Sequence, residues 1–147
     1  MNSDRVCVDA SLALTWLLSP QAEESADALR RQWLKDDIEL IGPPLFHAEV
    51  TSVLREEVFF KRLSFEEGEE AFSLYSVIPI RILNSPAIYR KAWELAIKYN
   101  QPRTYDMQYL AVAEIEDCEF WTLDRKIVNT ISSKNQRIKW LGDYDQR

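Results

Sequence analysis

Glycine and proline are scarce in this chain of 147 residues, which has three glycines and six prolines. Because these residues interrupt regular elements, their scarcity predicts long helices and strands with few breaks. We find no repeat, low-complexity tract or linker, and expect residues 1–147 to form a single domain. Apolar residues make up 46% and aromatic residues 12%, which excludes a disordered chain, since such chains lack the residues that build a core.

Residues that bind zinc or form disulfides are equally few. Two cysteines, Cys7 and Cys118, are too few for a zinc cluster or a disulfide framework, and their apolar surroundings favour small buried side chains. The longest apolar runs, such as residues 12–18, fall short of the roughly 20 residues that span a membrane. No basic segment precedes an apolar one as in an export signal. We therefore expect a soluble, cytoplasmic protein with no membrane association.

The net charge is −6, from 24 acidic residues against 18 lysines and arginines. This sum argues against a protein that holds nucleic acid mainly through a basic surface. It leaves open an enzyme that binds phosphates through metal ions.

Apolar runs alternate with segments of helical periodicity along the whole chain. The expected strands are Arg5–Asp9, Ile38–Ile41, Ile80–Leu83, Glu119–Thr122 and Ile138–Leu141. The expected helices are Ser11–Leu18, Ala22–Lys35, one from Pro44, one from Ser64 with a capping box to Glu67, Ser85–Tyr99, Thr104–Glu116 and Arg125–Ile131. No two-residue hairpin turn appears, so we predict a three-layer α/β fold with a central parallel sheet of about five strands.

Acidic residues stand at strand ends and helix starts, where parallel sheets bind ligands. Asp9 and Asp124 each follow an expected strand, although either residue alone is also a good helix N-cap. Glu49 lies three residues from Phe46, so it borders the buried stripe of its helix. Asp106, in the row of Leu110 and Ala113, is expected to point toward the sheet rather than water.

These four acids are expected to converge on one point. Packed carboxylates repel and raise one another's pKa, and divalent cations relieve the repulsion. Oxygen ligands without histidine or cysteine favour Mg²⁺ or Mn²⁺ over zinc. Because such ions activate water and stabilise charge on a phosphodiester, metal-dependent hydrolysis of a nucleic acid suits this set best.

Four segments, in this order, carry a family resemblance: Val6–Leu18, Pro43–Leu54, Thr104–Ala113 and Trp121–Ile127. They resemble the successive motifs of PIN-domain proteins, in particular the VapC-type toxins of prokaryotic toxin–antitoxin pairs. The resemblance implies a sheet of order 3-2-1-4-5 and a Mg²⁺- or Mn²⁺-dependent endoribonuclease, usually a homodimer, silenced by an antitoxin protein. It assigns catalysis and metal binding to Asp9, Glu49, Asp106 and Asp124, with Ser11 and Thr122 as supporting hydroxyls.

Several residues near these motifs have two interpretations. Arg103, Arg125 and Lys126 either contact RNA phosphates or are solvated charges that balance nearby acids. His47 is roughly 200° from Glu49 around a helix and is expected on the surface or in packing, outside the metal pocket. One aromatic group exceeds what a helix stripe needs, and we assign it to core packing, with a dimer or antitoxin groove as the alternative: Trp16, Phe59, Phe60, Phe65 and Phe72.

Three other kinds of protein are alternatives to a nuclease. A non-catalytic RNA- or protein-binding module with the same fold gains nothing from four clustered acids. A receiver-type phosphoacceptor domain needs paired acids after its first strand, where Ala10 and Ser11 follow Asp9. A phosphatase with an aspartate nucleophile needs a second aspartate two residues after Asp9, where this chain has Ser11. The sequence therefore predicts a nuclease.

Overall fold

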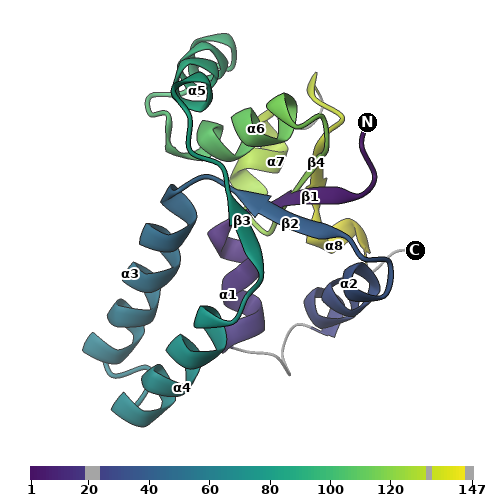
Figure 1. The fold of residues 1–147 in the computed structure, drawn as a ribbon. Coiled ribbons are helices and arrows are strands. Elements are labelled where there is room, and N and C mark those ends of the chain that lie inside the picture. The colour runs from purple at the N-terminus through teal and green to yellow at the C-terminus, as the bar shows by residue number, and fades with distance from the viewer. Residues whose placement is uncertain (19–23, 132–133, 145–147) are drawn as a thin grey trace.

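Five strands form one parallel sheet in the order β3-β2-β1-β4-β5 (Figure 1). The computed structural model describes residues 1–18, 24–131 and 134–144. The strands are β1 (Arg5–Val8), β2 (Glu39–Gly42), β3 (Ile80–Ile82), β4 (Glu119–Thr122) and β5 (Ile138–Trp140). Cys7 of β1 lies beside Ile41 on one side and Phe120 on the other. The predicted parallel sheet and the strand order implied by the resemblance are confirmed.

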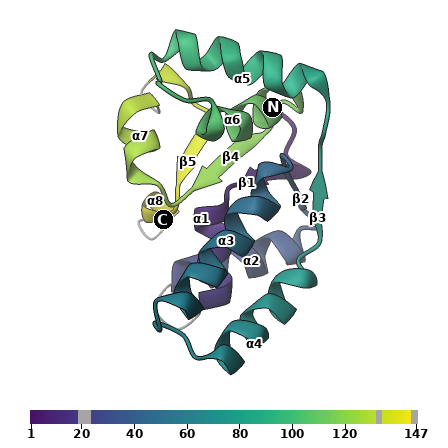
Figure 2. The same cartoon turned by 90° about the vertical axis from the view of Figure 1, so that its left-hand side faces the viewer.

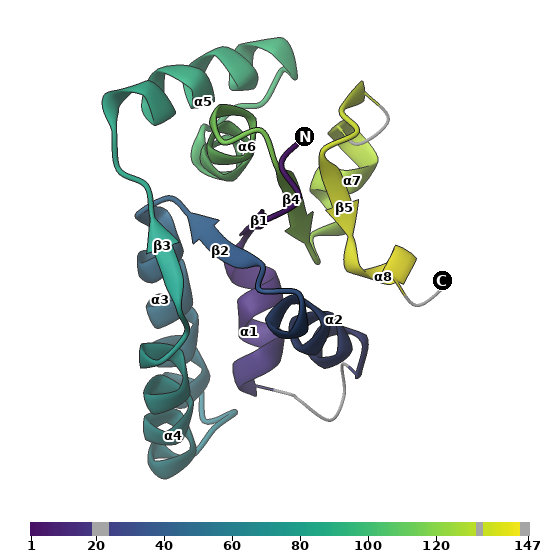
Figure 3. The same cartoon turned by 45° about the vertical axis from the view of Figure 1, so that its right-hand side comes forward.

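Helices cover both faces of the sheet. The described helices are α1 (Ala10–Leu18), α2 (Glu24–Lys35), α3 (Leu45–Phe59), α4 (Phe65–Ser76), α5 (Pro86–Lys98), α6 (Tyr105–Ile115), α7 (Arg125–Ile131) and α8 (Leu141–Tyr144). Helices α1 and α2 lie on one face, and α6 lies on the other with α5 outside it (Figure 2). Helices α3 and α4 form a hairpin that extends away from the sheet (Figure 3).

The centre of the sheet is apolar on both faces. Every residue of Val6–Val8 is at most 3% exposed, as are Phe120 and Trp121 of β4. Such continuous apolar runs are typical of parallel strands covered by helices on both sides. Cys7 and Cys118 are fully buried free thiols, which confirms their assignment as small core side chains.

Local signals placed most elements within a residue or two. The predicted capping box is present, since the Ser64 hydroxyl accepts from the Glu67 amide and the Glu67 carboxylate accepts from the Ser64 amide. In α2 the apolar spacing of Ala26, Leu29, Trp33 and Leu34 predicts one buried stripe. This prediction is wrong at Leu34, which is 62% exposed because it stands one residue, about 100°, beyond Trp33. The expected start of this helix at Ala22 lies outside the described residues. Helix α8 was not predicted, because four residues are too few to show a period.

The aromatic group divides between the core and the surface. Trp16 is buried, as core packing predicts. Core packing is wrong for Phe59, Phe60, Phe65 and Phe72, which are 49–67% exposed. These four lie along the α3–α4 hairpin and the turn that joins its helices, where no third layer covers them. None of the helices in the described residues is long and apolar enough to cross a membrane.

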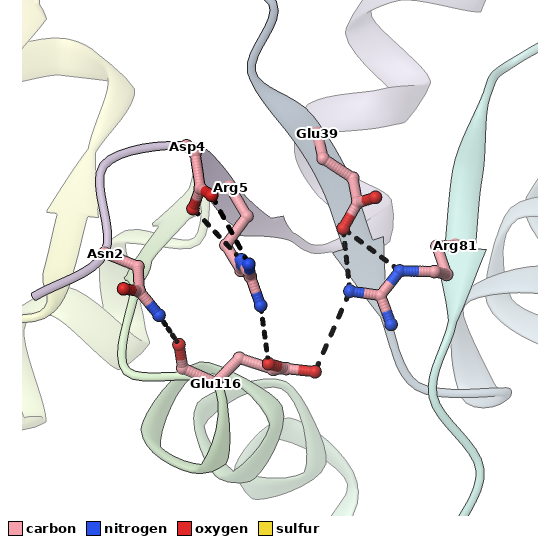
Figure 4. A network of polar contacts seen from close by, with 6 residues as sticks. All are labelled: Asn2, Asp4, Arg5, Glu39, Arg81 and Glu116. Atoms are coloured by element: carbon pink, nitrogen blue, oxygen red, sulfur yellow. Dashed lines mark hydrogen bonds and ion pairs between the residues drawn. The ribbon is translucent and has the colours of Figure 1, made fainter.

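Charged side chains pair across the amino ends of the strands (Figure 4). Arg5 of β1 bonds Asp4 and Glu116, the latter at 2.9 Å. Arg81 of β3 bonds Glu39 of β2 at 2.7 Å and lies 3.8 Å from the second Glu116 oxygen. This network joins three strands to the end of α6, and arginines neutralise its acids Asp4, Glu39 and Glu116.

Candidate active site

The four predicted acids all come to the opposite, carboxyl end of the sheet. Asp9 follows β1 directly, and Asp124 stands two residues after the adjacent strand β4. Helix α3 starts after β2 and carries Glu49, while the first turn of α6 carries Asp106. Strands β2 and β3 lie on one side of β1, and β4 and β5 on the other, so the acids surround the point where strand order reverses.

Asp9 is the most enclosed of the four, at 6% exposed. Its Oδ1 accepts from the Ser11 hydroxyl at 2.6 Å and from the Leu12 amide at 3.1 Å, and its Oδ2 accepts from the Thr122 hydroxyl at 2.5 Å. The bond from the Leu12 amide makes Asp9 an N-cap of α1, which was the alternative role that the sequence allowed for it. Only one of the two carboxylate oxygens has this role. Burial raises the pKa of Asp9 to about 6 against these hydrogen bonds, and the charge of Glu49 raises it further.

Glu49 is half-buried and is held by a residue that the sequence analysis missed. The Tyr109 hydroxyl donates to its Oε1 at 2.5 Å. Tyr109 is 2% exposed, and its ring stacks on Phe120 at 5.9 Å between centroids. Burial raises the pKa of Glu49, and the charge of Asp106 adds to the rise. The available signal was the position of Tyr109, which is three residues after Asp106 and so on the same side of α6.

Asp106 and Asp124 form the outer part of the site. The expectation that Asp106 is turned from water is wrong, because the first turn of α6 leaves its side chain exposed. Partial desolvation raises the pKa of Asp106, Asp124 raises it further, and Lys126 opposes the rise. The Oδ1 of Asp124 accepts from the amides of Lys126 and Ile127, so Asp124 also caps α7.

The electrostatic effects link the four acids in sequence: Asp9 with Glu49, Glu49 with Asp106, and Asp106 with Asp124. In residues 1–18, 24–131 and 134–144 none of them forms an ion pair, unlike the acids of the network in Figure 4. Uncompensated carboxylate oxygens are the donors that Mg²⁺ and Mn²⁺ prefer. In that same part of the chain, no three acidic, histidine or cysteine side chains are close enough to enclose one ion. A bound ion would therefore have to draw the outer carboxylates toward Asp9.

A pocket of about 410 Å³ opens beside Glu49 and Asp106. It is lined by Leu45, Glu49, Gln101, Pro102, Arg103, Tyr105, Asp106, Met107, Lys126 and Ile127. Two of the three predicted phosphate contacts, Arg103 and Lys126, are in this lining. The Arg125 guanidinium instead lies over the Trp140 ring, 4.7 Å from its centroid.

His47 lies outside this pocket, as its place on the helix predicts. It is exposed, and its Nδ1 bonds the Tyr75 hydroxyl of α4 at 2.6 Å. Its role is in the α3–α4 contact.

Known proteins match this chain over most of its length. A model of the PIN domain matches residues 6–131. The VapC ribonuclease Mb0985 of Mycobacterium bovis is 27% identical over 125 residues, which is 85% of this chain and 90% of that protein. Ribonuclease VapC9 of Mycobacterium tuberculosis matches with the same identity and coverage.

Two solved structures share the fold. PAE2754 from Pyrobaculum aerophilum has a TM-score of 0.63 at 18% identity, covering 97% of this chain and 98% of that one. VapC20 of Mycobacterium tuberculosis, a sarcin-ricin loop cleaving toxin, has a TM-score of 0.57 at 15% identity, covering 80% and 87%. The family match contains all four acids, strands β2, β3 and β4, and all of β1 except Arg5. The chain belongs to the PIN domain family.

Proposed function

We propose that this protein is a Mg²⁺- or Mn²⁺-dependent endoribonuclease and the toxin of a type II toxin–antitoxin pair. One observation carries the proposal, namely four carboxylates without ion-pair partners in the described residues, gathered at the strand-order reversal of a PIN domain sheet. Arg103 and Lys126 in the adjacent pocket suit a polyanionic substrate. The ribonuclease names of the VapC relatives support RNA as that substrate.

Asp9, Glu49, Asp106 and Asp124 would hold the ion or ions. When bound, a divalent ion makes a water molecule acidic enough to attack phosphorus and offsets charge on the phosphate. Ser11 and Thr122 orient Asp9 through hydrogen bonds to its two oxygens. Tyr109 bonds one Glu49 oxygen, and the second Glu49 oxygen would be available to hold an ion. The rival, a non-catalytic module, explains the fold and the helix caps of Asp9 and Asp124. It gives no reason for grouping acids that raise one another's pKa.

The same proposal includes partners and setting. We propose that residues 1–147 act as one domain in the cytoplasm, as a homodimer, together with an antitoxin protein. The exposed phenylalanines of the α3–α4 hairpin support a protein partner, since apolar surface of this kind marks interaction sites.

The first experiment is cleavage of a structured RNA pool by the purified protein with Mn²⁺ or with EDTA. Asp9→Asn and Asp106→Asn are expected to reduce cleavage at least about 100-fold, because losing even a supporting residue of a metal site costs about 10–100-fold. Asp36→Asn is the matched control, since Asp36 is exposed at the amino end of the sheet and bonds only Gln32 in the described residues.

Cleavage by both site variants at the wild-type rate, or cleavage that persists in EDTA, contradicts the mechanism. A folded protein that neither cleaves RNA nor binds Mn²⁺ is the non-catalytic module instead.

A further inference from the structure

Part of the lining of the pocket beside the acids has no role in the proposed metal chemistry. Tyr105, the first residue of α6, belongs to this part of the lining, as do Leu45 and Pro102. Its side chain is 58% exposed. Within the described residues, its ring and hydroxyl make no hydrogen bond, ring contact or cation contact. Tyr105 is therefore a flat aromatic surface that is open to a ligand.

Exposure alone would not distinguish Tyr105 from other surface aromatics such as Tyr89 and Trp93 of α5. Its surroundings do. Tyr105 is next in sequence to Asp106, and both residues line the same pocket. The lining also includes a second proposed metal ligand, Glu49, and two basic side chains, Arg103 and Lys126.

These three kinds of side chain match three parts of a nucleotide chain. Basic side chains attract phosphates that flank the reacting one. The acids would hold an ion, which offsets charge on the reacting phosphate. An aromatic ring offers a stacking surface to a base, whatever its identity, because every base has a π-face. Lys126 and Asp106 line the same pocket, so the basic and acidic side chains lie within one site.

We infer that Tyr105 is a stacking platform for the nucleobase beside the reacting phosphate, and that this base is unpaired. The inference rests on the proposed function. A base inside an A-form duplex is covered by its neighbours on both faces, whereas a base in a loop or single strand is free to stack on a tyrosine. Removing one such contact weakens binding by about 5-fold to 100-fold.

The test measures RNA affinity apart from cleavage. Tyr105→Ala and Tyr105→Phe are compared in an Asp9→Asn background, in Mn²⁺, with a fluorescently labelled, random-sequence, single-stranded oligoribonucleotide and anisotropy as the readout. Tyr105→Ala is expected to raise Kd about 5-fold to 100-fold, whereas Tyr105→Phe keeps the ring and stays within about twofold of the background. Tyr89→Ala, an exposed tyrosine on α5 outside the pocket lining, is the matched control and is expected to leave Kd unchanged.

Each other outcome overturns the inference. Equal affinities for all variants, or no affinity for this RNA in the Asp9→Asn background, exclude a base platform. An equal loss in Tyr105→Phe and Tyr105→Ala assigns the effect to the hydroxyl. Equal affinity for the same oligoribonucleotides annealed to their complements excludes the unpaired base. A change of oligomeric mass in Tyr105→Ala without a change in Kd makes Tyr105 part of a protein interface.

Failure of the proposed function has a different signature. If the proposed function is wrong, the wild-type protein does not cleave RNA, whatever its affinity for RNA. With cleavage established, Tyr105→Ala alone is expected to raise KM for a single-stranded substrate by a larger factor than it lowers kcat, since the platform binds a base and touches no reacting atom.

Discussion

Asp9 is a buried carboxylate, and its burial disfavours the charged form. Burial raises its pKa from 3.8 to about 6, although three hydrogen bonds favour the charged form. Between these two pKa values the folded protein binds a proton that the unfolded chain has released. The contribution of Asp9 to stability is therefore highest below pH 4 and falls as pH rises toward and through 6. At neutral pH the metal-free protein holds a buried charge at a net cost.

Asp9→Asn removes that cost while it keeps the shape of the side chain. We expect the metal-free variant to be more stable than wild type at pH 7, by up to about 3 kcal/mol, and to gain little at pH 4. Urea unfolding in EDTA at the two pH values measures this. Asp36→Asn, an exposed aspartate, is the control and should change little at either pH. A variant that is less stable than wild type at pH 7 would mean that the hydrogen bonds to the carboxylate outweigh its desolvation.

At the scale of elements, the α3–α4 hairpin depends on a glycine. Gly68 of α4 is buried, and a Cβ built on it would lie 2.3 Å from Cγ2 of Val58 on α3. Valine has one strongly preferred rotamer in a helix, so this methyl group has little freedom to move away. Gly68 thus permits the close approach of two helices that also carry the exposed phenylalanines and the His47–Tyr75 hydrogen bond.

Two opposing effects decide the result of Gly68→Ala. Alanine favours a helix over glycine by about 1 kcal/mol, whereas overpacking costs about 1–3 kcal/mol. We expect the clash with Val58 to prevail and the variant to lose about 1 kcal/mol in urea unfolding. In a Val58→Ala background the clash is gone, and the same substitution should stabilise by up to about 1 kcal/mol. The same sign of effect in both backgrounds would contradict this packing.

The elements that the sequence predicted most closely are those with local signals. Strand β4 and helix α7 were placed to the residue, because a buried apolar run ends at polar Thr122 and Asp124 caps the helix after it. The acids were found because strand ends and helix starts fix where a side chain stands in a parallel sheet. Tyr109 was missed because an aromatic residue in a buried row looks like core, and its partner Glu49 is 60 residues away.

The sequence pattern did not predict features that depend on tertiary arrangement. The four exposed phenylalanines are of a residue type that usually packs in a core, and the extension of α3–α4 beyond the sheet leaves them uncovered. Arg125 adjoins an acid motif in sequence, but the fold brings Trp140 of β5 under its guanidinium. In both cases the surroundings of the side chain depend on how other elements pack, which one sequence does not show.

At the scale of the whole molecule, the two ends of the sheet differ in how their acidic residues are paired. At the amino end, Arg5 and Arg81 neutralise Glu116 and Glu39 within the protein itself (Figure 4). At the carboxyl end, the charges of neighbouring acids add to the raised pKa values of Asp9, Glu49 and Asp106. We therefore expect a cation from solution to act at the carboxyl end, where the four acids have no ion-pair partner among the described residues.

This asymmetry predicts how Mn²⁺ changes stability. An ion that binds the folded state alone stabilises it by about 2.7 kcal/mol at 100 times its Kd. We expect the wild-type melting temperature to rise with Mn²⁺ at constant ionic strength, and the rise to be strongly reduced in Glu49→Gln. Glu39→Gln is the matched control, because it removes an acid that Arg81 already neutralises, and should keep the wild-type rise. Equal rises in the two variants would show that Mn²⁺ acts on the overall negative charge rather than at the carboxyl end of the sheet.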